Sequence, residues 1–217
     1  AVASVNAVRG TRHRVDDALW AAALACICFA YLWVGPYFER LNNPNENVRV
    51  YMTRSIVEHG TFAIDPIIAE WGYVNDKATH SGKMYPGKAP GVSYLGVPGY
   101  FLYYHATEAL DLPRSRRSIV MVCRVTGTII PTLALLLWFG RVMRGSRGDP
   151  GVNLLAVVAV ALASTMMSYG SLFASHTLMA GCLFAGFSMV RLHVDAPGDV
   201  RPPFAMGFLL GWAIALE

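Results

Sequence analysis

Charge is scarce in this sequence. Charged side chains make up only 15% of the 217 residues, whereas hydrophobic side chains make up 54%, and the mean hydropathy is +0.40. Soluble domains carry about 25% charged residues, so the composition argues against a soluble domain and predicts an integral membrane protein. The sequence also has no phosphate-binding glycine loop, no zinc pattern and no serine nucleophile elbow, which excludes the enzyme classes that those motifs define.

Cysteine is also scarce, and every cysteine falls inside an apolar run. The four are Cys26, Cys28, Cys123 and Cys182. In such surroundings a thiol behaves as a small hydrophobic group, so the sequence predicts neither a disulfide framework nor a metal site built on cysteine. The net charge of +4 does not indicate nucleic acid as a partner, because the basic residues gather at the ends of the apolar runs.

Long apolar runs organise the chain. The first, Asp17 to Phe38, is uncharged after Asp17 and is long enough as a helix to cross a hydrocarbon core of about 30 Å. Within the longest later run, Ser168 to His176 is rich in Ser, Gly and Tyr and predicts a hairpin between two passes. We therefore expect an all-α polytopic membrane protein with about five spans. The later runs are Gly91 to His105, Ser118 to Gly140, Gly151 to Val190 and Phe204 to Leu216.

The last run is too short to span. It holds about thirteen residues before Glu217, whereas a spanning helix needs about twenty. The chain also starts without Met. We therefore expect the sequence to be the N-terminal part of a longer protein, with residues 118–217 forming further transmembrane helices that are truncated at the C-terminus.

Basic residues predict the orientation. Arg9, Arg12 and Arg14 precede the first run, and clusters of Lys and Arg mark cytoplasmic flanks. We therefore expect residues 1–16 to be cytoplasmic, residues 17–38 to cross the membrane and residues 39–117 to form an extracytoplasmic loop.

The orientation of the later basic clusters depends on whether residues 91–105 cross the bilayer. This run contains three glycines, one proline and four tyrosines, which favours an interfacial segment that does not cross. In that arrangement Arg141 to Arg147 and Arg191 to Arg201 lie inside, while Arg114 to Arg117 lie outside. The alternative is a span of fifteen residues through a locally thinned bilayer.

The outer loop begins with a predicted juxtamembrane helix from Asn43 to Gly60. Asn43 can cap it, Pro44 suits the first helical position, and Gly60 can adopt the left-handed conformation at its end. We expect one apolar stripe on this helix, with its charged residues Arg49, Arg54 and Glu58 facing water. Beyond it the sequence predicts a short extended run, Thr61 to Pro66, and then a hairpin formed by Trp71 to Asn75 and His80 to Tyr85.

Two residues of this loop are the main chemical candidates. Glu46 lies in the first turn of the predicted helix, close to the membrane, and can act there as a general base or a metal ligand. The alternative is that it only returns a hydrogen bond to the helix cap. Lys88, between Gly87 and Ala89, can bind a phosphate at the mouth of an apolar run. The alternative for this lysine is simple snorkelling to the interface.

Further along the chain, Arg124 stands six residues into an apolar run, where a charge is costly and has a partner or a function. We expect Arg124, Arg117, His176 and Tyr85 to join Lys88 in binding substrate, although a lone histidine such as His176 is also commonly structural. The remaining ionisable residues of the loop have no metal-ligand spacing, and ordinary solvation is the expectation for them. They are Asp65, Glu70, Asp76 and His80.

The order of these residues resembles the N-terminal part of the GT-C glycosyltransferases, the polytopic fold of protein O-mannosyltransferases, aminoarabinose transferases and oligosaccharyltransferases. Those families have an outer loop that opens with an acidic pair and a helix of the type Asp-Glu-x-x-Tyr, which Asn45-Glu46 through Tyr51 loosely follows. Lys88 matches their lysine before proline, Arg124 matches an arginine that opens the following helix, and residues 175–177 match a short outward turn. Asn45 stands in place of the first acid, and His176 stands where an acid is common.

The resemblance implies a membrane enzyme. Its reaction would be an inverting transfer of sugar from a polyprenyl-phosphate donor, with Glu46 as the base and Lys88 and nearby arginines on the lipid phosphate. The expected partners are the donor and membrane lipids, and the sequence leaves open whether a divalent metal takes part. The rival hypotheses are a transporter or non-catalytic subunit whose outer loop docks a partner, and an inactive protein with the same fold.

Overall fold

The computed structural model describes residues 2–35, 43–195 and 201–217. The chain is 75% helical, and the strands that the described residues contain form one antiparallel hairpin, so the expected all-α class is confirmed. The elements are α1 (Val2–Trp33), α2 (Pro44–His59), α3 (Asp65–Trp71), β1 (Lys77–His80), β2 (Lys83–Pro86), α4 (Gly91–Ala109), α5 (Arg116–Arg124), η1 (Val125–Ile129), α6 (Ile130–Arg144), α7 (Pro150–Leu162), α8 (Thr165–Gly170), α9 (His176–Asp195) and α10 (Arg201–Leu216).

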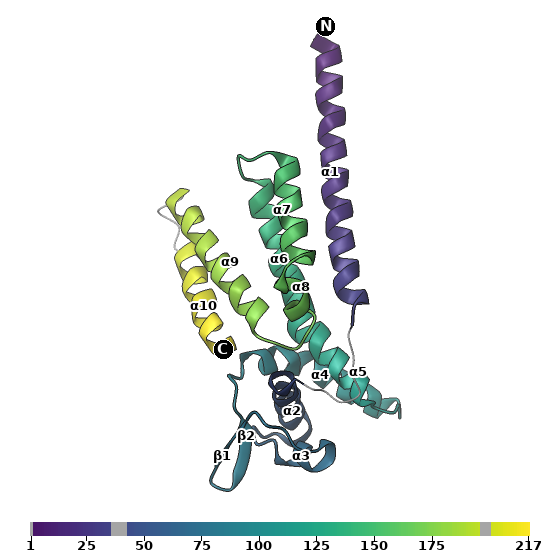
Figure 1. Cartoon of the computed structure of the whole chain (residues 1–217), viewed down its shortest axis with the longest axis vertical. Helices are drawn as coiled ribbons and strands as arrows, with labels where there is room; N and C mark the ends of the chain where they lie inside the picture. Colours follow the sequence, from purple (N-terminus) through teal and green to yellow (C-terminus); the bar gives the residue numbers. More distant parts are fainter. Residues whose placement is uncertain (1, 36–42, 196–200) are drawn as a thin grey trace.

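Long helices and short elements occupy opposite ends of the molecule. Figure 1 shows α1, α6, α7, α9 and α10 extending away from a group that contains α2, α3 and the β1–β2 hairpin. The N-terminus lies at the far end of α1, whereas the C-terminus at the end of α10 lies beside α2 and α4 (Figure 1). We call the end that carries α2 and the hairpin the loop end.

Two helical segments are long and apolar enough to cross a membrane. Within the described residues these are Asp16–Trp33, of 18 residues, and Arg116–Arg144, of 29 residues, which joins α5, η1 and α6. The second contains the predicted run Ser118 to Gly140. Most of the first predicted span, residues 17–38, coincides with α1, but its last three residues lie outside the described part of the chain, as does Arg40. The shorter apolar helices are Pro150–Leu162, His176–Val190 and Pro203–Leu216.

Three groups of buried apolar side chains hold these elements together. One lies among α2, α4, α5, α9 and α10 and includes Tyr100 and Phe173. A second joins α1 to α6 and α7 and includes Trp20 and Leu136. The third lies under α2, α3 and the hairpin. The small elements of the loop end are therefore packed both against each other and against the long helices.

The two ends of the segment Arg116–Arg144 lie at opposite ends of the molecule. Arg144, at the end of α6, contacts Asp17 of α1, so this end of α6 lies beside the N-terminal half of α1. The α5 end of the same long segment lies at the loop end (Figure 1). Helix α4, which covers the predicted interfacial run 91–105, is not among the segments that pass the length and hydropathy test for a span.

Helix α2 confirms the prediction made from its caps. The Asn43 side chain accepts a hydrogen bond from the Asn45 N–H, Pro44 opens the helix, and Gly60 ends it with a φ of 63°. A left-handed φ favours glycine because other residues carry a Cβ that clashes there. The helix is buried on more than one side, so the expectation that Arg49 and Arg54 face water is wrong: their exposures are 2% and 4%.

Two other local expectations need correction. Asp65 and Pro66 begin the short helix α3 instead of ending an extended run, because Pro at an early helical position fits a helix start as well as a turn. The predicted hairpin exists, but its first strand is β1 and begins after Asn75. Ser81 and Gly82 form the turn, both with positive φ, as tight hairpin turns require.

Candidate functional site

A buried ion pair joins α2 to the long segment at α5. The Glu46 carboxylate accepts hydrogen bonds from Arg124, at 2.6 Å from Nε to Oε1 and 2.8 Å from Nη2 to Oε2. Both side chains are 2% exposed. Opposite charges compensate one another at such a depth, and the two-point geometry fixes the orientation of both groups. Arg124 immediately precedes η1, the single turn of π-helix in the segment.

The same carboxylate holds the connection between α8 and α9. Oε1 of Glu46 also accepts a hydrogen bond from the Phe173 N–H at 2.9 Å. The Phe173 ring is fully buried between Gly96 of α4 and Gly127 of η1, where an added Cβ would lie 2.7 Å and 2.3 Å from the ring, respectively. This close packing fixes the short connection that leads to Ser175 and His176.

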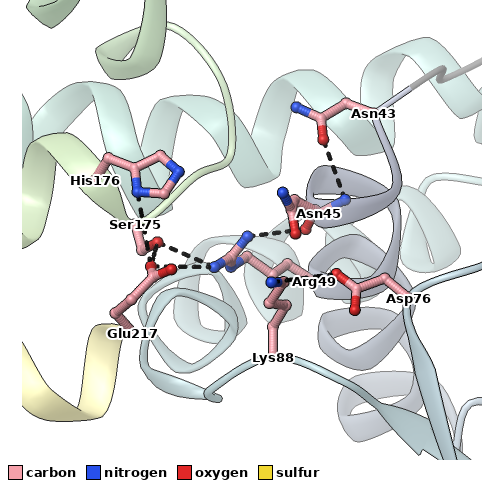
Figure 2. A network of polar contacts seen from close by, with 8 residues as sticks. All are labelled: Asn43, Asn45, Arg49, Asp76, Lys88, Ser175, His176 and Glu217. Carbon is pink, nitrogen blue, oxygen red and sulfur yellow. Dashed lines mark hydrogen bonds and ion pairs between the residues drawn. The ribbon is translucent and has the colours of Figure 1, made fainter.

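Arg49 lies at the centre of a polar cluster at the loop end. Its guanidinium donates to the Asn45 carbonyl and to the Ser175 hydroxyl, both at 3.0 Å, and lies 3.8 Å from the Glu217 carboxylate. Ser175 also hydrogen-bonds Glu217, and His176 Nδ1 lies 3.8 Å from the same carboxylate. Figure 2 shows Arg49 with Ser175, His176 and Glu217 to one side of it.

Lys88 and Asp76 complete this cluster from the two sides of the hairpin. The Lys88 Nζ lies 3.7 Å from Asp76 Oδ2, and the Gly87 N–H donates to the Asp76 carbonyl at 3.0 Å. A Cβ on Gly87 would lie 2.7 Å from Asp76 Oδ1, so glycine allows the two segments to approach. The charge of Asp76 also acts on Arg49, which places the two groups in one electrostatic environment (Figure 2).

The arrangement suits binding of an anion. Burial lowers the pKa of Arg49 below its ordinary value, although the charges of Glu217, Asp76 and Glu46 oppose this shift. Even the lowered pKa of an arginine leaves the guanidinium charged at neutral pH. Among the described residues, the buried Nε of Arg49 has no hydrogen-bond partner. The cluster therefore offers a buried cation with a spare donor beside a partly exposed ammonium.

The predicted site residues are divided between two environments. Glu46 and Arg124 form the buried pair, while Lys88 and His176 belong to the polar cluster. The two main candidates thus do not face each other: the carboxylate of Glu46 is engaged with Arg124 and Phe173, whereas Lys88 faces Asp76. Arg124 was expected to have a partner or a function, and Glu46 is a partner; its expected contact with substrate stays a prediction.

The other two predicted residues lie elsewhere at the loop end. Arg117 is exposed near the start of α5, and Tyr85 lies in β2, opposite Ala78. None of the contacts described above links either side chain to Arg49 or Lys88.

Sequence reasoning missed three members of the cluster. The sequence pattern places Arg49 on a water-facing side of the helix, groups Asp76 with the ordinary loop acids and does not single out Glu217. One feature of the sequence does point to this cluster. Asp76 lies at one end of the predicted hairpin and Lys88 lies beyond the other end, and antiparallel strands bring such positions together.

A second group of charges at the loop end surrounds Arg54, whose buried Nη1 has no hydrogen-bond partner among the described residues. The Arg54 Nε lies 2.6 Å from Glu58, its Nη2 lies 2.7 Å from Glu70, and its guanidinium stacks on the Trp71 ring at 4.3 Å from the centroid. The Tyr100 hydroxyl donates to Glu58. This group connects α2, α3 and α4, and its carboxylates neutralise the arginine, which fits a structural role.

Within the described residues, no group of three or more His, Cys, Asp or Glu side chains is placed to hold a metal ion. Comparison with protein-family models, with curated proteins and with solved structures finds no match to this chain.

Proposed function

We propose that this protein is a membrane glycosyltransferase that transfers a sugar from a polyprenyl-phosphate donor to an acceptor on the extracytoplasmic side. In this proposal the long helices cross the membrane and the loop end faces outward, as the basic residues near the N-terminus predict. The observation that carries the proposal is the meeting of Arg49, Lys88 and His176 with two carboxylates at one end of an apolar helical bundle.

The chemistry of sugar transfer needs such cations. When the bond between the sugar and the phosphate breaks, negative charge develops on the phosphate oxygen, and preorganised cations near it lower the barrier. Arg49 and Lys88 would hold the phosphate, and the donor would displace the carboxylates that neutralise them in the free protein. The position at the mouth of the bundle suits a donor whose lipid chain stays in the bilayer.

The geometry changes one part of the expected mechanism. Glu46 accepts hydrogen bonds from Arg124 and from the Phe173 N–H and is 2% exposed, so an acceptor hydroxyl has no open route to its oxygens. A general base needs hydrogen-bond contact with the proton that it removes. We therefore propose that Glu46 positions the site, by fixing Arg124 and Phe173, and that a carboxylate of the polar cluster takes the acceptor proton.

A transporter or docking subunit is the competing function. Transporters place several ionisable groups near the middle of the membrane, around a central substrate site. In the described part of Arg116–Arg144, the one arginine between the terminal basic clusters is Arg124, and it is paired with Glu46 near the loop end. The polar cluster lies at the end of the bundle, which favours a reaction at the membrane surface over transport of a substrate across the membrane.

The test is a transfer assay with the purified full-length protein. Polyprenyl-phosphate donors carrying different labelled sugars are incubated with it in detergent or nanodiscs, and the extracted acceptor and lipid fractions are analysed for label. We expect transfer from at least one polyprenyl-phosphate sugar, with release of polyprenyl phosphate. Absence of transfer from every donor, together with uptake of the substrate into sealed vesicles, would support the transporter instead.

A further inference from the structure

Asp76 is the carboxylate of the polar cluster that is best placed for proton transfer, and we propose that it is the general base of the sugar transfer. The inference depends on the proposed function and names a residue that the sequence pattern did not single out. It rests on three observations: which carboxylates are already engaged, how the hairpin places Asp76 beside Lys88, and how exposed its side chain is.

The three acids near the site differ in their engagement. Glu46 is enclosed by Arg124 and the Phe173 N–H. Glu217 is held by the Ser175 hydroxyl and also faces Arg49. In the described part of the chain, by contrast, no hydrogen bond reaches the carboxylate of Asp76, whose nearest cation is the Lys88 Nζ at 3.7 Å. Its oxygens therefore have free lone pairs that can accept a hydroxyl proton.

The β1–β2 hairpin fixes the position of Asp76 relative to Lys88. Asp76 directly precedes β1, and Lys88 follows β2 by two residues, so the strand pairing sets their separation. The Gly87 N–H anchors the Asp76 carbonyl at 3.0 Å, and the absence of a side chain at Gly87 leaves room for the carboxylate. A base held directly beside a paired strand is oriented in advance, which favours general base catalysis.

The accessibility of Asp76 also fits the role. Its side chain is 24% exposed and that of Lys88 is 33% exposed, whereas Glu46 and Arg124 are 2% exposed. A substrate can therefore reach both groups without breaking the buried pair. Donor phosphate bound to Lys88 would release Asp76 from its present cation, at the point where the acceptor arrives.

The sugar transfer is a single displacement at the anomeric carbon of the donor. The acceptor hydroxyl oxygen forms a bond to the anomeric carbon of the donor while its proton passes to the Asp76 carboxylate. The bond between the anomeric carbon and the phosphate oxygen breaks, and its electron pair remains on the polyprenyl phosphate, which Lys88 and Arg49 hold. The step consumes one donor and one acceptor and needs neither an oxidant nor a reductant.

The experiment measures steady-state transfer by Asp76→Asn in the full-length protein. We expect kcat to fall by about 10²- to 10⁴-fold, the usual contribution of a general base. We expect the donor KM to stay unchanged or to fall, because the substitution removes the anion that competes with phosphate for Lys88. Asp76→Glu should restore part of kcat, since it returns a carboxylate.

Asp111→Asn is the matched control. Asp111 is an exposed aspartate in the turn after α4, with a φ of 50°, a conformation that asparagine tolerates. This variant should keep wild-type kinetics. Wild-type kcat in Asp76→Asn would overturn the assignment, and so would a lower kcat accompanied by a higher donor KM, because Asp76 would then only position Lys88. An inactive wild-type protein would instead overturn the proposed sugar transfer.

Discussion

Replacing Glu46 by Gln should destabilise the folded protein strongly, whatever its effect on catalysis. The substitution keeps the shape of the side chain but leaves the Arg124 guanidinium, 2% exposed, opposite a neutral amide. Removing one partner of a buried ion pair costs about 3–5 kcal/mol. The amide oxygen can still accept the bonds that Oε1 receives from Arg124 Nε and the Phe173 N–H, but an NH2 group replaces Oε2, so the hydrogen bond from Arg124 Nη2 is lost and two donors face each other.

The expected shift is large enough to measure directly. In a chain of this size a loss of 1 kcal/mol lowers the unfolding midpoint by about 2–4 °C, so Glu46→Gln should lower it by about 6–20 °C. Thermal unfolding in detergent can be followed by the fluorescence of the five tryptophans. Glu108→Gln is the control, because its contact with His105 is on the surface and contributes little.

A double variant separates the charge effect from local packing. Adding Arg124→Met to Glu46→Gln removes the buried charge, so it should recover part of the lost stability, as apolar replacements of buried pairs do. The reasoning is refuted if Glu46→Gln unfolds at the same midpoint as Glu108→Gln, since Arg124 would then not depend on this carboxylate. It is also refuted if the double variant loses more free energy of unfolding than Glu46→Gln and Arg124→Met lose together.

Two further predictions test the packing and electrostatics of the loop end. Gly127→Ala should lower the free energy of unfolding by about 1–3 kcal/mol, because the new Cβ would lie 2.3 Å from Phe173. Gly207→Ala is the control: its Cβ would have nothing within 4 Å, so it should stabilise α10 by up to about 1 kcal/mol. Equal unfolding midpoints for the two variants would contradict this prediction. Burial raises the pKa of Glu58, but hydrogen bonds from Arg54 and Tyr100 outweigh it and leave the pKa below its ordinary value. Above its ordinary pKa, ionised Glu58 therefore stabilises the fold, and this contribution is lost as the pH falls through its lower folded-state pKa. Glu58→Gln should therefore make the unfolding midpoint fall less steeply as the pH is lowered. An unchanged fall would contradict the pairing.

The elements that the sequence predicted well are those specified by neighbouring residues. Asn43, Pro44 and Gly60 define the ends of α2 through contacts within one turn, so these ends can be recognised without knowing the fold. The apolar run from Ser118 likewise predicts a long helix from composition alone. Helix α3 was missed because Asp65-Pro66 is compatible with both a turn and a helix start, and only packing against α2 and the hairpin selects the helix.

The site was harder to predict because its contacts join distant parts of the chain. Arg49 hydrogen-bonds Ser175, 126 residues further along, and this partner cannot be inferred from the periodicity of α2. Glu46 is similar: its position at the start of a helix suggests a general base, a metal ligand or a capping group, but Arg124 lies 78 residues away and engages it. Lys88 was recognised from its local setting between small residues, whereas its neighbour Asp76 depends on the register of the hairpin.

The central claim is that Arg49 and Lys88 bind the phosphate of a polyprenyl lipid. The most direct measurement is the affinity of the full-length protein for polyprenyl phosphate and for the matching polyprenol, in the wild type, in Lys88→Ala and in Lys83→Ala, whose lysine is exposed at the other end of β2. We predict tighter binding of the phosphate than of the alcohol, a loss of about tenfold or more in Lys88→Ala, and none in Lys83→Ala. Equal affinity for the two lipids, or an equal effect of the two lysine substitutions, would contradict the claim.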